Sequence, residues 1–192
     1  MAIRKDKIIV VDIEATCWEG YDAPEGQENE VIEIGLCLLD ATDFSLSDKR
    51  SLLVKPTESV VSDFCTELTS LTQEQVDTQG IAFDEACSIL EKEYDSRNRL
   101  WASWGNWDRM IMKKQCKRRK VRYPFSKKHV NLKRVFQDAH GERMGLARAM
   151  KALQLDVEGT MHRGDDDAWN TGRLLSELVH IHERTILRKY GF

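Results

Sequence analysis

The feature that constrains the fold most is the stretch from Ile8 to Glu14, which reads Ile-Ile-Val-Val-Asp-Ile-Glu. Its first four residues are branched and apolar on both strand faces, a pattern typical of a central strand that is covered on both sides. Side chains two residues apart in a strand share a face, so Asp12 and Glu14 point the same way. The chain must therefore bury this strand between two layers and also accommodate two neighbouring negative charges at its end.

The remaining pattern predicts an α/β fold. After a polar loop at Glu19–Glu30, strands are predicted at Val31–Asp40 and Ser51–Pro56, and the short connections make them part of a three-stranded antiparallel meander. Later strands are predicted at Arg99–Gly105 and around Val130. Thr72–Gln75 fits a capping box, and helices are predicted at Phe83–Tyr94, Asp108–Lys117, Leu132–Ala139, Leu146–Leu153 and Asp166–Arg188. We therefore expect a mixed central sheet of about five strands flanked by helices, in a single domain spanning residues 1–192.

Composition argues against several classes of protein. The 192 residues are 41% hydrophobic and 32% charged, as in a folded globular domain, and the net charge of −3 argues against a surface uniformly positive for nucleic acid. No apolar stretch approaches the roughly 20 residues that span a bilayer, so no membrane contact is expected. The five cysteines are scattered without a C-x-x-C pair, which favours free thiols in the cytoplasm. A dinucleotide-binding oxidoreductase is discarded because no glycine-rich turn follows the first strand.

Three separate acidic features suggest a metal site. Asp12 and Glu14 repel each other, and a divalent cation would remove both that repulsion and the cost of burying them. Hard oxygen ligands select Mg²⁺ or Mn²⁺ rather than zinc. Asp108 follows a predicted strand and a glycine-containing turn, and His162 stands five residues before Asp167 in MHRGDDDAWNTG. Each feature alone also fits a structural role: a strand end in water, an acid at a helix start, a structural histidine.

Taken in order, these residues resemble a known family. The succession D-x-E, a mid-chain Asp, and H-x-x-x-x-D resembles the DEDDh 3′-to-5′ exonucleases, which have a ribonuclease-H-like fold, over residues from about Ile8 to Leu175. The stretches DIEATCW, SDFCTELTSLT and WGNWD resemble the Eri-type branch, whose members trim RNA 3′ ends. The resemblance implies release of nucleoside 5′-monophosphates from single-stranded RNA or short 3′ overhangs.

The resemblance also implies roles for individual residues. Asp12, Glu14, Asp108 and Asp167 would hold two divalent cations, Mg²⁺ or Mn²⁺, and His162 would be the general base. One position departs from the family, because this chain has Asp165 where an apolar residue is usual. Spacing selects Asp167 as the ligand, but the adjacent Asp165 and Asp166 leave the register open.

Candidate substrate contacts come from the same comparison. The terminal nucleotide would contact Ala15 and Thr16, with Leu71 beside it and its base between the aromatic rings of Phe64 and Trp107. We expect Trp101 and Trp104 to belong to the core. A basic run within residues 113–122 is either a solvated helix face or a path for the phosphate backbone; its candidate residues are Lys113, Lys114, Lys117, Arg118 and Arg119.

Two alternatives to an exoribonuclease stay open. The same chemistry could act on DNA 3′ ends, because contacts to the 2′-hydroxyl cannot be located in the sequence. The chain could also be a non-catalytic module that binds RNA or protein on a nuclease fold. The presence of all five catalytic residue types argues against the second alternative, since a binding module does not need clustered acids.

Overall fold

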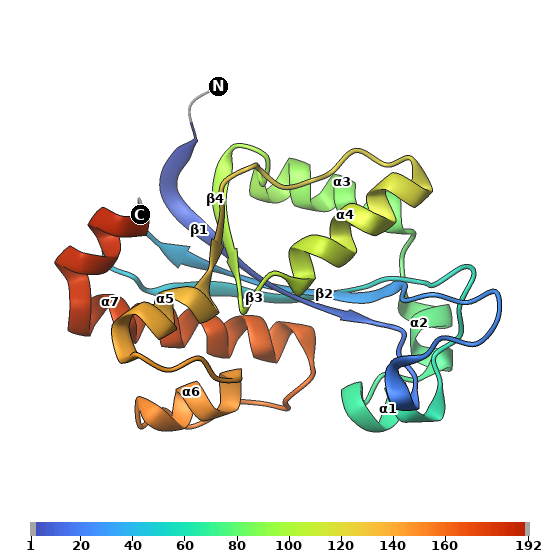
Figure 1. Ribbon diagram of the computed structural model, residues 1–192. Helices are drawn as coiled ribbons and strands as arrows, with labels where there is room; N and C mark the ends of the chain where they lie inside the picture. The colour runs from blue at the N-terminus through green and yellow to red at the C-terminus, as the bar shows by residue number, and fades with distance from the viewer. Residues whose placement is uncertain (1–2, 191–192) are drawn as a thin grey trace.

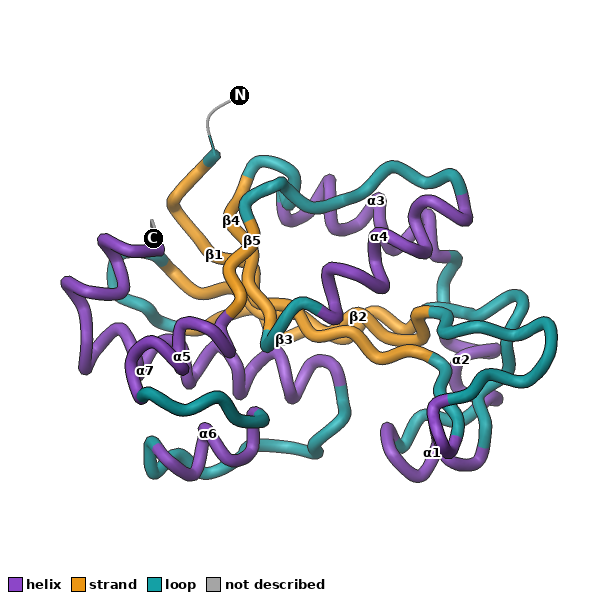
Figure 2. The backbone as a smooth tube through the Cα atoms, in the orientation of Figure 1, coloured by secondary structure: helices purple, strands orange, loops and turns teal. Residues whose placement is uncertain are grey.

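A computed structural model describes residues 3–190, except for the side chains of residues 21, 183–185, 187 and 188. Its centre is a five-stranded sheet in the order β3-β2-β1-β4-β5, with helices on both sides (Figures 1 and 2). The strands are β1 (Arg4–Ala15), β2 (Val31–Asp40), β3 (Leu46–Leu53), β4 (Arg99–Ser103) and β5 (His129–Asn131). The helices are η1 (Glu19–Tyr21, a 3₁₀ turn), α1 (Asp63–Thr69), α2 (Gln73–Gln79), α3 (Phe83–Tyr94), α4 (Trp107–Arg119), α5 (Leu132–His140), α6 (Leu146–Ala152) and α7 (Gly164–Tyr190).

The strand that opens the chain lies in the middle of the sheet. β1 pairs antiparallel with β2 and parallel with β4, and β2 in turn pairs antiparallel with β3. Its neighbours on both sides satisfy its backbone, and helices cover both faces of the sheet, which explains why its side chains are apolar on both faces. The predicted α/β fold with a mixed five-stranded sheet is confirmed.

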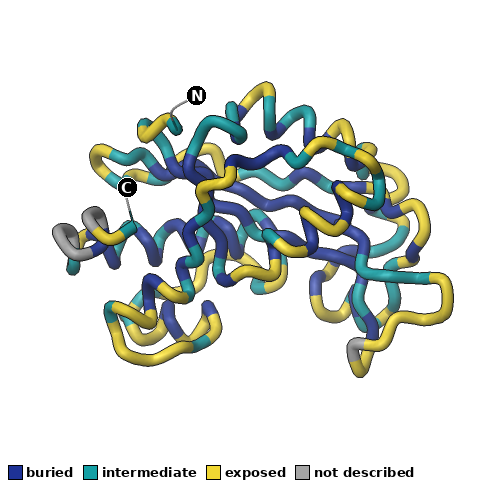
Figure 3. The backbone as a smooth tube through the Cα atoms, turned by 45° about the horizontal axis from the view of Figure 1, so that its top comes forward, coloured by how far each residue is buried: buried dark blue, intermediate teal, exposed yellow. Residues whose placement is uncertain are grey.

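Alternate residues of β1 enter two different cores. Ile9, Val11 and Ile13 pack in the cluster that includes α3 and α4, whereas Ile8 and Val10 pack in the cluster that includes α5, α6 and α7. Figure 3 shows the middle of the sheet in the colour of buried residues, and every residue of β2 except Asp40 is buried. Because the alternation continues past Val11, the side chains of Asp12 and Glu14 lie on the α7 side of the sheet.

Several element boundaries differ from the sequence-based predictions. β3 begins at Leu46 and not at Ser51; as an edge strand it pairs only with β2, so its first half can expose polar residues such as Asp48 and Lys49. Helix α1 was not predicted from the sequence. Ser62 caps this helix by accepting a hydrogen bond from the backbone N–H of Cys65. Such a capping serine, followed by an acid in the first turn, was the available signal.

The cysteines and the helices bear on where the protein could function. All five cysteines are free thiols, although the cytoplasmic location itself stays a prediction. Within the described residues, no helix combines the length and apolar character that a bilayer-spanning segment requires.

A close contact between two glycines sets the position of α7. Gly35 of β2 lies opposite Asp12 of β1, and a Cβ added to Gly35 would lie 1.7 Å from the carbonyl carbon of Gly164, the first residue of α7. Only glycine allows the two backbones to approach this closely. The start of α7 is thereby placed directly over the end of β1.

Replacing Gly35 with alanine should destabilise the protein by about 1–3 kcal/mol or more, because the added methyl group forces α7 away from β2. Gly145→Ala is the matched control: nothing lies within 4 Å of a Cβ added at this helix N-cap, so its cost should stay below about 1 kcal/mol. Urea unfolding of both variants measures the difference. Equal stabilities would show that the two backbones do not require glycine.

Candidate active site

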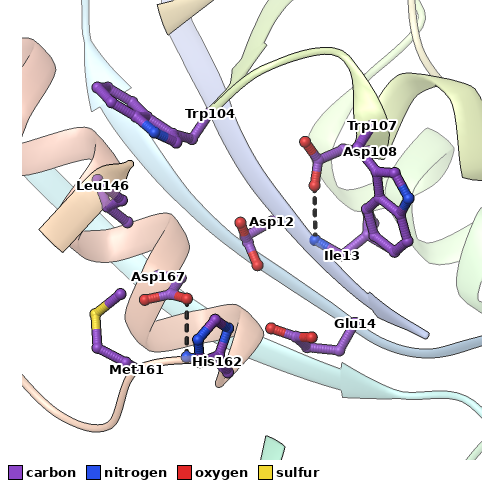
Figure 4. Close-up of a pocket in the computed structure, with 10 residues that line it drawn as sticks. All are labelled: Asp12, Ile13, Glu14, Trp104, Trp107, Asp108, Leu146, Met161, His162 and Asp167. Atoms are coloured by element: carbon purple, nitrogen blue, oxygen red, sulfur yellow. Dashed lines mark hydrogen bonds between the residues drawn. The ribbon is translucent and has the colours of Figure 1, made fainter. Parts of the chain in front are cut away.

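The carboxyl end of β1 opens into a cleft of about 320 Å³ (Figure 4). The lining side chains come from β1, the turn between β4 and α4, α4 itself, α6, the segment before α7 and the first turn of α7, and they are up to 155 residues apart in sequence. The lining residues are Asp12, Ile13, Glu14, Trp104, Trp107, Asp108, Leu146, Met161, His162 and Asp167. All five residues predicted to be catalytic are therefore brought together in one cleft.

Asp108 is fixed against the central strand. It lies in the first turn of α4, is buried, and its Oδ1 accepts a hydrogen bond of 3.1 Å from the backbone N–H of Ile13. This bond crosses from α4 to the residue between Asp12 and Glu14. A helix-start acid is locally favoured by the free N–H groups there, but this one also contacts the strand that carries the other two carboxylates.

The third part of the cleft is the tight turn before α7. Asp167 is buried in the first turn of α7, and its Oδ2 accepts a 2.9 Å hydrogen bond from the backbone N–H of His162. His162 has a left-handed backbone, with φ of +61°, a strained conformation for a residue with a side chain. The bond to Asp167 helps to hold this conformation, and the exposed imidazole lines the cleft beside Glu14 (Figure 4).

The four carboxylates disfavour one another's charge. The pKa of Asp12 is raised well above its ordinary value, first by burial and then by the charges of Asp108 and Glu14. Burial and the neighbouring Asp167 raise the pKa of Glu14 to about 9. Burial also raises the pKa of Asp167 to about 6, although the His162 N–H opposes this shift, and it raises the pKa of Asp108.

This arrangement fits a divalent cation. Glu14, His162 and Asp167 each offer a ligand atom within 4.8 Å of the other two. The Oδ1 atom of Asp167 is buried and has no hydrogen-bond partner among the described residues. A buried carboxylate oxygen without a partner is costly unless a cation or water satisfies it. The oxygen-rich donor set favours Mg²⁺ or Mn²⁺.

The structure also separates the three consecutive aspartates of α7. Asp166 pairs with Lys49 and accepts a 2.7 Å hydrogen bond from the backbone N–H of Thr160. Asp165 is half-buried and is not part of the cleft lining. Only Asp167 lies in the cleft, in agreement with the register that the spacing selected.

An ion pair between the buried Glu33 and the partly exposed Arg163, which the sequence did not indicate, anchors the turn that carries His162. The Glu33 carboxylate, which is fully buried on β2, accepts hydrogen bonds from the Arg163 guanidinium at 3.1 Å and from the Gly164 backbone N–H at 2.8 Å. Glu33 is the cross-strand neighbour of Glu14. In the sequence, Glu33 is simply one residue of the apolar stretch VIEIG. Its role becomes visible only through its contact with Arg163, which lies 130 residues later in the chain.

The candidate base-stacking residues are not brought together. Trp107 lines the cleft and its side chain is 45% exposed. Phe64 is half-buried on α1 and is not part of the cleft lining. Trp104 packs against the core on the α7 side, as expected, and its ring meets that of Phe136 edge-on; it also lines the cleft. Trp101 is fully buried, as expected.

The side chains of the other three proposed nucleotide contacts pack or form hydrogen bonds within the protein. Leu71 is 1% exposed and packs with Ile32, so it has almost no surface to offer a nucleotide in this conformation. The Thr16 hydroxyl donates to the carbonyl oxygen of Glu28 and accepts from the N–H of Glu30. Ala15 is buried against the α3–α4 side. Tertiary packing uses these side chains, which local sequence could not indicate.

The basic run divides between two roles. Lys114 and Arg118 pair with Glu28, and Arg119 pairs with Glu30. These three cations fasten α4 to an acidic loop, which favours a structural role for them; binding of a phosphate backbone by the run stays a prediction. The side chains of Lys113 and Lys117 are exposed.

Comparison with known proteins gives consistent matches. Residues 9–175 match the model of the RNase_T family, which is described as exonuclease. The 3′-5′ exonuclease Snipper of Drosophila melanogaster is 30% identical over 193 residues, which cover 90% of this chain and 69% of Snipper. The 3′-5′ exoribonuclease 1 of Rattus norvegicus is 30% identical over 189 residues, which cover 91% of this chain but only 53% of that protein.

A solved structure matches over almost its whole length. The nuclease domain of 3′hExo, a DEDDh family member crystallised with rAMP, is similar with a TM-score of 0.83 and 27% identity. The match covers 94% of this chain and 95% of that domain. The present chain therefore corresponds to a nuclease domain, and it spans about half to two thirds of the two curated relatives.

Removing one of the clustered charges should stabilise the metal-free protein. Asp12→Asn should raise the melting temperature in chelator by several degrees, because relief of about 1–2 kcal/mol of repulsion shifts a domain of this size by about 2–4 °C per kcal/mol. Mg²⁺ should raise the wild-type melting temperature more than that of the variant. Asp22→Asn, at an exposed loop position, is the control and should change neither value; a destabilised Asp12→Asn would contradict the repulsion.

The Glu33–Arg163 pair can be measured by a double-mutant cycle. Glu33→Gln and Arg163→Met should show a coupling free energy of about 1–3 kcal/mol, because loss of Arg163 leaves the fully buried Glu33 carboxylate without its cation. The exposed pair Arg148–Glu142, with a closest N–O distance of 3.4 Å, is the matched control, and its coupling should be below about 0.5 kcal/mol. Additive effects at Glu33 and Arg163 would show that the ion pair does not anchor the turn.

Proposed function

The chain belongs to the RNase_T exonuclease family, within it to the Eri-type DEDDh 3′-to-5′ exonucleases, and from this premise we propose that it removes nucleotides one at a time from the 3′ ends of single-stranded RNA. Nucleoside 5′-monophosphates are the expected products. Because the chain spans only part of the curated relatives, we propose this activity for the domain by itself.

One observation supports the proposal most directly. Four carboxylates and an imidazole, distant in sequence, face one cleft, and the acids there carry pKa values raised by burial and by one another. A fold that only binds RNA would gain nothing from burying four like charges, since these groups oppose both folding and the approach of a polyanion. A site that uses cations to meet phosphate requires this arrangement.

The residues have distinct roles in the proposed reaction. Asp12, Glu14, Asp108 and Asp167 would hold two divalent cations, which supply an activated water and stabilise the charge on the departing 3′ oxygen. His162 accepts the proton of the attacking water, and Asp167 keeps the His162 backbone in its left-handed conformation through the bond described above. Attack by water leaves no covalent intermediate, so no nucleophilic serine or cysteine is needed.

The preference for RNA rests on the relatives and on the cleft. The rat relative is named an exoribonuclease, and the 3′hExo domain was crystallised with rAMP. Trp107 offers an exposed aromatic face at the cleft mouth, where a terminal base could stack with a gain of about 1–3 kcal/mol. DNA remains the alternative substrate, because a stacking surface does not distinguish the two sugars.

The decisive experiment uses 3′-labelled and 5′-labelled RNA and DNA oligonucleotides of the same sequence, single-stranded and duplex, with Mg²⁺, Mn²⁺ or chelator. We expect mononucleotide release from the 3′ end of single-stranded RNA with either metal and none in chelator. Equal rates on matched DNA would contradict the proposed preference for RNA but would still support 3′-to-5′ hydrolysis.

Two variants test the assigned roles. Asp12→Ala and His162→Ala should each lower the rate of mononucleotide release at least 10²-fold, because one removes a cation ligand and the other the proton acceptor. Circular dichroism and melting curves check that both variants are folded. If Asp12→Ala digests RNA as fast as the wild type, the catalytic assignment fails and a non-catalytic RNA-binding module becomes the better interpretation.

A further inference from the structure

A second hollow lies on the flank of α4, away from the acidic cleft. It has a volume of about 380 Å³, and its lining residues come from α4 and from the loop that leads from α4 to β5. Figure 1 shows the course of this helix and loop. Four cations line it: Arg109, Lys113, Lys117 and Lys127. The lining contains no acidic residue. We call this hollow the α4 groove.

The cations of the groove differ from Lys114, Arg118 and Arg119 of the basic run in forming no ion pair among the described residues. Lys114, Arg118 and Arg119 are held by Glu28, Glu30 and Glu58. In the part of the chain that the structure describes, none of the four groove cations forms an ion pair. Arg109, Lys113 and Lys117 are spaced by four residues, so they stand in a row on one face of the helix.

This row begins at the acidic cleft and leads away from it. Arg109 directly follows Asp108, which lines the cleft. From position 109 to position 117 the helix rises about 12 Å, a length over which a stacked strand presents about three or four phosphates. The spacing of the cations thus suits a polyanion whose end lies in the cleft.

The floor of the groove is apolar and includes an aromatic ring. Cys116, Val121 and Tyr123 line it, and the Lys113 ammonium stands 5.9 Å from the centre of the Tyr123 ring. Phosphates along the rim and a base against this floor would satisfy both parts of the groove. An acidic polypeptide would meet the rim cations but would leave the floor unoccupied.

We propose that the α4 groove binds the phosphate backbone of a single-stranded nucleic acid upstream of the 3′ end held in the cleft. This inference rests on the proposed function for the direction of the strand. It assigns backbone binding to the unpaired face of α4 and withdraws that role from Arg118 and Arg119, whose ion pairs hold the loop.

Binding, measured without cleavage, tests the groove separately from the enzyme activity. Affinities for a fluorescent 12-nucleotide RNA are determined in chelator across a salt series, with Asp12→Ala present in every protein. Adding Lys113→Gln and Lys117→Gln should reduce the slope of log K against log salt by about 1.4, because two phosphate contacts of a single strand are lost. The loss of affinity should be larger for the 12-nucleotide strand than for a 3-nucleotide strand.

The matched control changes the same charge elsewhere. Lys5→Gln with Lys92→Gln alters two exposed lysines on β1 and α3 that have no ion pair among the described residues, and it should leave the slope unchanged. Lys117→Gln with Lys127→Gln is a second groove variant that preserves the Lys113–Tyr123 contact, and it should reproduce the reduced slope. A slope unaffected by both groove variants, or reduced equally by the control, overturns the proposal.

Two further outcomes separate the alternatives. Displacement of the RNA by poly-glutamate as effectively as by unlabelled RNA at equal charge concentration would overturn the assignment to nucleic acid. If the wild-type protein releases no mononucleotide but the groove variants still lower the slope, the proposed activity fails while the groove assignment stands.

Discussion

The site depends on one close contact, the approach of the first turn of α7 to β2 across Gly35 and Gly164. Because no side chain separates these backbones, Asp167 and His162 reach the end of β1, where Asp12 and Glu14 already stand. The buried Glu33 then closes the contact by accepting hydrogen bonds from Arg163 and Gly164. The same few residues thus join the C-terminal helix to the sheet and assemble the acidic cleft.

The cleft is an example of local electrostatic strain held by a rigid frame. Burial and mutual repulsion raise the pKa values of its acids, and the left-handed backbone at His162 adds conformational strain. The surrounding sheet, apolar on both faces of β1, provides the stability that tolerates these costs. Divalent cations would convert the repulsion into attraction, so the unfavourable features of the empty fold are the ones the proposed chemistry needs.

Helix α4 carries basic residues in two different environments. One face of this helix carries Arg118 and Arg119, which neutralise Glu30 and fasten a loop. The other face carries Lys113 and Lys117, which form no ion pair among the described residues and border a hollow with an apolar floor. The net charge of −3 does not indicate this difference. Ion pairing, and not composition, decides which cations are available to bind a ligand.

The sequence by itself determined the central strand and the mixed sheet, because strand alternation is a local property of the chain. Its resemblance to the DEDDh exonucleases named the five residues of the cleft, with Asp165 and Asp166 leaving the register at Asp167 open. Only the tertiary structure decided what those motifs could not express. It selected Asp167 among three adjacent acids, since Asp166 is drawn to Lys49 and Thr160, and it revealed Glu33 and Arg163 as partners. It also showed that Leu71 and Thr16 make contacts within the fold, and that Trp104 lines the cleft as well as packing against the core. Most of the deciding contacts join residues far apart in sequence. The hydrophobic pattern and the short motifs therefore do not indicate them.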